Sequence, residues 1–152
     1  METKQLSSQF ENDFAHSDVV CRKATYEEDV HQGIDIWLND IPFAWRKRRI
    51  SVTDHKQISI RASRSSGSKT EYQKLLDGDC KAMFYVFEFT DAIVICRVLD
   101  IVKCLRNEQF ETQENPDGET SAMYIGLRDV KHLLVNYERE PWVRQTEQWE
   151  WF

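Results

Sequence analysis

GIDIWLNDIPFAWRKR, residues 33–48, is the stretch that decides the fold. Apolar side chains alternate with other residues on both sides of Asn39-Asp40, a pair that favours a two-residue β-hairpin turn. We therefore predict two antiparallel strands, over residues 34–38 and 41–46. One face of this hairpin pairs only apolar side chains, and we expect it to pack in a core: Leu38 with Ile41, Ile36 with Phe43, and Ile34 with Trp45.

The opposite face of the same hairpin carries the candidate functional side chains. Asp35 is expected opposite Ala44, and Arg46 and Arg48 continue along that face. Because both sequence neighbours of Asp35 are core isoleucines, its carboxylate is held in place. A fixed carboxylate beside basic side chains is what Mg²⁺-assisted cleavage of a phosphodiester requires, since the carboxylate holds the ion and the cations stabilise developing charge. The alternative is a structural Asp35–Arg46 ion pair within the sheet.

Charge is distributed unevenly along the chain. The net charge is −6, yet residues 44–69 contain eight basic side chains and one acidic side chain. Such segregation gives an electropositive surface on an acidic body, which is typical of a protein that binds phosphates locally. The alternative is a solvated basic ribbon whose charges are balanced by acidic residues elsewhere.

Composition places the chain among the globular proteins. With 152 residues, 41% hydrophobic and 30% charged, it is long enough for one core. No apolar run approaches the roughly 18 residues of a membrane span, and the N-terminus lacks the apolar stretch of a signal peptide. We therefore expect a cytoplasmic protein with no membrane contact. The four cysteines lack metal-binding spacing and are expected to be free thiols.

Sequence patterns predict one domain over residues 1–137, followed by a tryptophan-rich tail over 138–152 that docks on the domain or on a partner. Helix signals lie at residues 8–16, 25–32, 68–77, 100–107 and 128–137. Strand signals beyond the hairpin lie at 57–62, 82–87, 92–98 and 122–125, and residues 113–118 indicate a loop. Hairpin strands followed by a helix and a further strand indicate an α/β fold with a mixed sheet flanked by helices.

The order helix, three strands, helix, strand, with Gly33-Ile34-Asp35 opening one strand and basic residues on the next, resembles the PD-(D/E)XK nuclease superfamily. The resemblance covers about residues 8–89. It implies a restriction-endonuclease-like αβββαβ core with additional C-terminal strands and helices. It also implies cleavage of DNA with bound Mg²⁺ or Mn²⁺.

Carried over residue by residue, the resemblance implies an acid at Glu11 on the first helix and the metal-binding aspartate at Asp35. The acid-x-Lys triplet of the superfamily falls on Ala44-Trp45-Arg46, and alanine cannot ligate a metal. In this superfamily the missing carboxylate can move to the following helix, where Glu71 is available with Lys74 one turn further on. The alternative for Glu71 is a helix-capping role in the Ser68-to-Glu71 box.

The resemblance also assigns roles to the basic residues. Arg46 takes the place of the lysine near the scissile phosphate; because it stays protonated, it stabilises charge but is a poor general base. The DNA backbone would be held by four further cations of the basic segment, Arg48, Arg61, Arg64 and Lys69.

Three hypotheses follow. The first is a metal-dependent DNA endonuclease or nuclease-like phosphodiesterase. The second is a catalytically inactive pseudo-nuclease that binds nucleic acid or a nucleic-acid-handling protein, as an inhibitor or assembly factor of a phage or mobile element; Ala44 is its main support. The third is an interaction module that contacts a second copy or a partner through the tail tryptophans, Trp142, Trp149 and Trp151.

Overall fold

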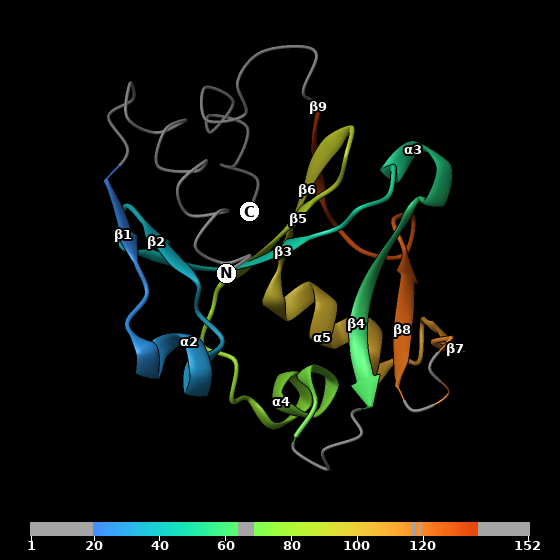
Figure 1. Ribbon diagram of the computed structural model, residues 1–152, viewed down its shortest axis with the longest axis horizontal. Coiled ribbons are helices and arrows are strands. Elements are labelled where there is room, and N and C mark those ends of the chain that lie inside the picture. Colours follow the sequence, from blue (N-terminus) through green and yellow to red (C-terminus); the bar gives the residue numbers. More distant parts are fainter. Residues whose placement is uncertain (1–19, 64–68, 117, 119, 137–152) are drawn as a thin grey trace.

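The computed structural model describes residues 20–63, 69–116, 118 and 120–136. Within them the chain forms a mixed sheet of six strands, a second sheet of three strands, and four helices, so the expected mixed α and β architecture is confirmed at that level (Figure 1). The predicted helix over 8–16, the tail over 138–152, and the site candidates Glu11 and Arg64 lie outside the described residues.

The six-stranded sheet has the order β1-β2-β3-β5-β6-β9. Its strands are Cys21–Lys23 (β1), Ile36–Leu38 (β2), Ile41–Lys47 (β3), Phe84–Glu88 (β5), Ala92–Arg97 (β6) and Leu133–Asn136 (β9). Neighbouring strands pair antiparallel except β3 and β5, which run parallel with Ala44 opposite Tyr85. A parallel pair needs a long crossover connection. Here the crossover is residues 48–83.

The crossover contains the first strand of the second sheet. It comprises α3 (Val52–His55), β4 (Gln57–Ser63) and α4 (Glu71–Asp77). The second sheet has the order β4-β8-β7, with β8 at Ser121–Gly126 and β7 at Glu111–Glu114. Residues 57–62 are thus a strand, as predicted, but they do not extend the sheet of the hairpin. The third antiparallel strand next to the hairpin in the six-stranded sheet is instead β1, which pairs with β2.

The N-terminal caps of two helices can be compared with their predictions from the sequence. The α2 helix (Tyr26–Gln32) begins at a capping box of Thr25 and Glu28 and ends at Gly33, as predicted. The α4 helix begins at Thr70, which forms a capping box with Gln73. The predicted capping role of Glu71 is therefore wrong by two residues. Its side chain is left available for contacts away from the helix.

The C-terminal part departs most from expectation. The helix predicted over 128–137 is wrong, because Leu133–Asn136 form β9 and add to the sheet beside β6. Buried Leu133 and Val135 alternate with two exposed residues, the period of a strand. β7 also forms where only a loop over 113–118 was expected; all four of its side chains are exposed, so it carries no hydrophobic signal. The α5 helix (Val98–Arg106) starts two residues before its predicted start.

Two buried clusters lie on the two faces of the six-stranded sheet. One includes Phe43, Trp45 and Val86. The other includes Tyr85, and it continues into α4, α5 and the second sheet, which lie on this side of the strands (Figure 1). The predicted hairpin register holds from Leu38–Ile41 to Ile36–Phe43. Ile34, however, joins the second cluster, so its predicted pairing with Trp45 is wrong.

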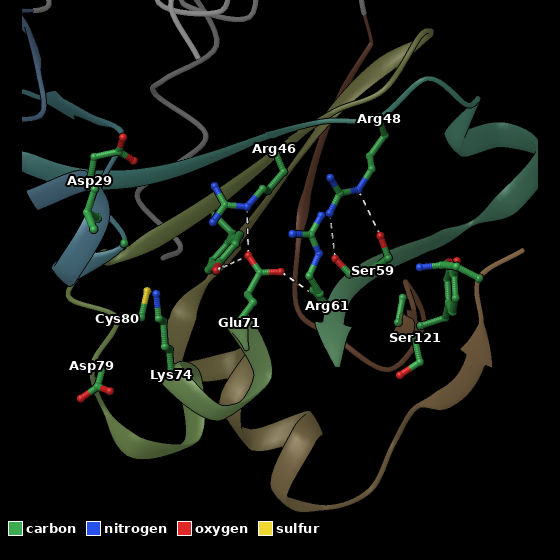
Figure 2. A pocket seen from close by; sticks show the side chains of 16 residues that line it. Asp29, Arg46, Arg48, Ser59, Arg61, Glu71, Lys74, Asp79, Cys80 and Ser121 are labelled. Carbon is green, nitrogen blue, oxygen red and sulfur yellow. Dashed lines mark hydrogen bonds and ion pairs between the residues drawn. The ribbon is translucent and has the colours of Figure 1, made fainter. Parts of the chain in front are cut away.

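The face that carries Ala44 is not the open polar surface that the sequence suggested. Ala44 is fully buried, since the helices and the second sheet cover this face. Arg46 and Arg48 project from it into the space between the two sheets (Figure 2). The polar side chains of β3 are therefore enclosed in a cleft.

The four cysteines are free thiols, as predicted, and Cys96 and Cys104 are buried. Among the helices that the structure describes, none is long and apolar enough to cross a membrane.

Candidate functional site

A cleft of about 580 Å³ lies between the two sheets and the N-terminal end of α4 (Figure 2). Its walls come from α2, β3, β4, α4, β5 and β8, which are far apart in sequence. Five of the predicted site residues line it: Arg46, Arg48, Arg61, Glu71 and Lys74. The other two predicted site residues within the described part of the chain, Asp35 and Lys69, do not line this cleft.

Arg46 is the centre of the cleft. Its Nη1 donates to Asp35 Oδ2 and its Nε donates to Glu71 Oε2, both at 2.9 Å. The guanidinium also lies over the Tyr85 ring, 5.4 Å from its centroid. Burial opposes the charge, but the Glu71 and Asp35 carboxylates outweigh it and hold the pKa of Arg46 above its usual value. The cleft thus contains a permanent cation fixed between two acids.

Asp35 is held by the backbone at the start of the hairpin. Its N–H donates to the Phe43 carbonyl at 2.8 Å, and its Oδ2 accepts the Trp45 N–H at 2.7 Å. The carboxylate thereby satisfies a β3 donor at the position where β2 has not yet begun, which explains why the regular register stops here. The ion pair with Arg46 that was the alternative for this residue is present.

The protonation of Asp35 is unusual. Burial raises its pKa to about 6, with the Asp29 carboxyl adding to the rise, against the lowering effects of Arg46 and of the Trp45 N–H. Asp29 lies on α2, and it lines the cleft. The Asp29 carboxyl is therefore close enough to Asp35 to oppose its ionisation.

Glu71 is fully engaged. Its Oε2 accepts from Arg46 and from the Tyr85 hydroxyl at 2.8 Å, and its Oε1 accepts the Arg61 N–H at 3.1 Å. Despite burial, Arg46 and these hydrogen bonds hold the pKa of Glu71 below its usual value. Burial and the Glu71 charge raise the pKa of Tyr85, so its hydroxyl remains a donor. Glu71 therefore joins α4, β3, β4 and β5 through one carboxylate.

Arg48 joins the two sheets. Its Nε donates to Ser59 Oγ at 3.0 Å and its Nη2 donates to the Ser59 carbonyl at 2.9 Å. The guanidinium lies over Phe87, 5.6 Å from the ring centroid. Burial lowers its pKa, although an arginine remains charged at any working pH. Arg48 fixes the width of the cleft while presenting positive charge to it.

Lys69 is placed differently from expectation. Its Nζ lies 2.7 Å from Asp77 and 2.9 Å from Asp79, in ion pairs on the exposed side of α4. These contacts compete with any phosphate, so its predicted role in nucleic-acid binding gains no support from its position.

The sequence reasoning gave no site role to two groups that matter here. Tyr85 was predicted to lie in a buried strand, and it does. A buried phenol hydroxyl usually needs a hydrogen-bond partner, and this requirement could have indicated that Tyr85 contacts a polar group. Asp29 stands among the acids at the start of α2, a place where acids are usually solvated. Its proximity to Asp35 depends on the α2–β2 connection, which no local pattern reveals.

The carboxylates differ in their capacity to hold a divalent cation. Both oxygens of Glu71 accept hydrogen bonds, whereas the hydrogen bonds that Asp35 accepts from Trp45 and Arg46 both go to Oδ2. In the part of the chain that the structure describes, no group of three His, Cys, Asp or Glu side chains has metal-site geometry. Mg²⁺ binds through one or two carboxylates completed by water and substrate phosphate. The Asp29–Asp35 pair fits that donor set, and the Asp35–Glu71 pair does not while Arg46 bridges it.

Comparisons with protein-family models, with curated proteins and with solved structures found no match to this chain. The resemblance to the PD-(D/E)XK superfamily therefore rests on the residues and on the order of elements described above.

Proposed function

We propose that this protein is a metal-dependent DNA endonuclease of the PD-(D/E)XK type. The observation that carries the proposal is the convergence of the Asp35 and Glu71 carboxylates on Arg46 in the wall of the cleft, through contacts that span 11 and 25 residues of sequence. The order of strands adds support. The β2–β3 hairpin is followed later in the chain by α4 and by a strand parallel to β3, as the resemblance implies, although the third strand of the implied core, β4, pairs with β8 in the second sheet.

In this proposal the side chains divide the work of cleavage. Asp35, with Asp29, would hold Mg²⁺ or Mn²⁺; when bound, such an ion polarises a phosphate and lowers the pKa of a water. Arg46 stabilises the charge that develops on the phosphate. Glu71 positions Arg46 through the pair at 2.9 Å. Arg48 and Arg61 hold the sugar-phosphate backbone of the DNA along the wall of the cleft.

A second candidate function is the binding of nucleic acid in the same cleft without cleavage. Its support is specific: Ala44 supplies no carboxylate, and the Arg46 guanidinium already bridges Asp35 and Glu71. A fixed guanidinium attracts phosphate as a metal does, but it does not lower the pKa of water. On this alternative, the protein is a pseudo-nuclease that binds nucleic acid. The third hypothesis, contact through the tail tryptophans, concerns residues outside those described.

The test is cleavage of supercoiled plasmid with Mg²⁺ or Mn²⁺, alongside DNA binding measured by fluorescence anisotropy. We expect nicking by the wild type, loss of nicking in Asp35→Asn, and normal nicking in the matched control Asp54→Asn, which changes an exposed acid on α3. DNA binding without cleavage under either ion would support the second candidate. A protein that neither binds nor cuts DNA would refute both.

A further inference from the structure

Two cavities meet at Tyr124. The cleft described above has Tyr124 in its wall, and a second cavity of about 580 Å³ has the same residue in its wall. The second cavity is lined by residues from the start of β4, the end of β8 and the turn that follows β8, including Lys56 and Arg128. The two cavities therefore share a wall on the face of the second sheet that carries Tyr124.

The register of this sheet leaves the Tyr124 ring uncovered by large neighbours on its strand. Tyr124 lies between Ser59 on β4 and Glu111 on β7. Side chains on one face of a strand recur every second residue, so its neighbours along β8 are Ala122 and Gly126. Both are small. The opposite face of the sheet carries buried isoleucines of the core: Ile58, Ile60 and Ile125.

Cations flank this aromatic side chain on both sides. Arg48 and Arg61 lie in the cleft on one side, and Lys56 and Arg128 lie in the second cavity. Glu111 and Asp129 are the acids beside the second pair. Strand β8 has 6 residues, which at roughly 3.3 Å per residue span about 20 Å. That length accommodates several phosphates along one strand.

We propose that the joined cavities bind an unpaired stretch of nucleic acid, with a base stacked on Tyr124 and phosphates against the flanking cations. This inference rests on the proposed function, because it uses the same cleft. The half-buried Tyr124 ring, with small side chains on either side along its strand, stacks on a base whose face is free, and the paired bases of a duplex do not offer that face. The expected substrate is therefore a single strand, or a frayed or unpaired site in DNA.

The test is anisotropy with labelled oligonucleotides of about 12 nucleotides, a length within the usual range of single-strand sites. The same sequence is used as single-stranded DNA, single-stranded RNA and duplex DNA. We expect the single strand to bind at least tenfold more tightly than the duplex. The DNA and RNA arms show which sugar is preferred.

Variants of Tyr124 isolate the stacking contribution. Tyr124→Leu keeps apolar bulk in the strand but removes the aromatic face, and we expect it to weaken single-strand binding roughly tenfold with the salt dependence unchanged. Tyr124→Phe should bind as the wild type does. The control Tyr26→Leu changes an exposed tyrosine on α2 and should have no effect. Thermal melting confirms that each variant is folded.

Duplex binding as tight as single-strand binding would overturn the inference, as would wild-type binding by Tyr124→Leu or a loss in Tyr124→Phe equal to that in Tyr124→Leu. The two proposals fail separately. A protein that nicks plasmid but ignores Tyr124 variants refutes only this inference. A protein that binds single strands through Tyr124 but never cleaves refutes only the nuclease proposal.

Discussion

The two faces of the six-stranded sheet are built by the same strands and differ in chemistry. On one face β3 places Phe43 and Trp45, which are buried among other apolar side chains. On the other face the same strand places Ala44, Arg46 and, just beyond its end, Arg48. The first face depends on removal of apolar surface from water. The second encloses charges, which are stable there only because each is paired.

This difference separates stability from function. A face made only of apolar groups responds to volume and is indifferent to pH. A face with Asp35, Arg46 and Glu71 responds to pH and to the loss of any one partner, because the remaining charges stay buried. The four predictions below test this contrast, beginning with the largest expected effect.

Arg46→Met should have the largest effect on stability. It leaves the Asp35 and Glu71 carboxylates without their shared cation, and breaking such a pair costs about 3 kcal/mol in the free energy of unfolding. The loss should be smaller at pH 5, where Asp35 takes up a proton more readily. Urea denaturation at both pH values measures it. The matched control Arg49→Met changes an exposed arginine; an equal loss there would contradict the assignment.

Val86→Ala tests the apolar face. Val86 is fully buried, and removing two methyl groups should lower the free energy of unfolding by about 2.5 kcal/mol, the sum of lost transfer energy and a residual cavity. The loss of stability should be equal at pH 5 and pH 7. Under conditions where the variant is fully folded, its DNA binding should be unchanged. A pH-dependent loss would mean that the two faces are not separable.

The pH dependence of Asp35 provides a third test. Its pKa is about 6, above the usual value near 3.8, so the folded state favours the protonated acid. The associated stability is present below pH 4 and is lost as the pH rises through 6. Relative to Asp35→Asn, which stays neutral, the wild type should lose about 2 kcal/mol between pH 4 and pH 7. A constant difference between the two proteins across this range would exclude the raised pKa.

Tyr85→Phe should have the smallest effect of the four. It removes the hydroxyl that donates to Glu71 at 2.8 Å and leaves the ring in place. Loss of a hydrogen bond to a charged group costs about 1.5 kcal/mol. Thermal or urea unfolding measures the change, with Tyr72→Phe as a control on the partly buried surface of α4. Equal effects from both variants would remove Tyr85 from the cluster.

Local sequence signals predicted the elements whose causes are local. The Asn39-Asp40 turn has positive φ at both residues, 48° and 64°, as a tight hairpin requires, and Gly33 ends α2 with φ 67°. Such conformations are decided within a few residues. The sequence therefore located the hairpin, α2 and the carboxylate of Asp35 beside Arg46.

Local sequence signals gave wrong predictions where a distant strand or a competing helix cap decides the structure. Residues 133–136 became a strand because β6 offered a pairing edge, and residues 57–63 left the hairpin's sheet to pair with β8. Glu71 was assigned to a cap because Ser68 stands at the right spacing, yet Thr70 and Gln73 cap the helix. In each case the competing signals are locally similar, and a distant contact decides between them.

The sequence by itself determined the hairpin, its apolar face, and the presence of an acid and several arginines on adjoining strands, because alternation and turn geometry act over neighbouring residues. Only the tertiary structure decided that the polar face is enclosed, that Glu71 holds Arg46, that Asp29 lies near Asp35, and that Tyr124 lines two cavities. These relations join segments that are far apart in the chain. They arise from the second sheet closing over β3, which buries charges that must then find their partners.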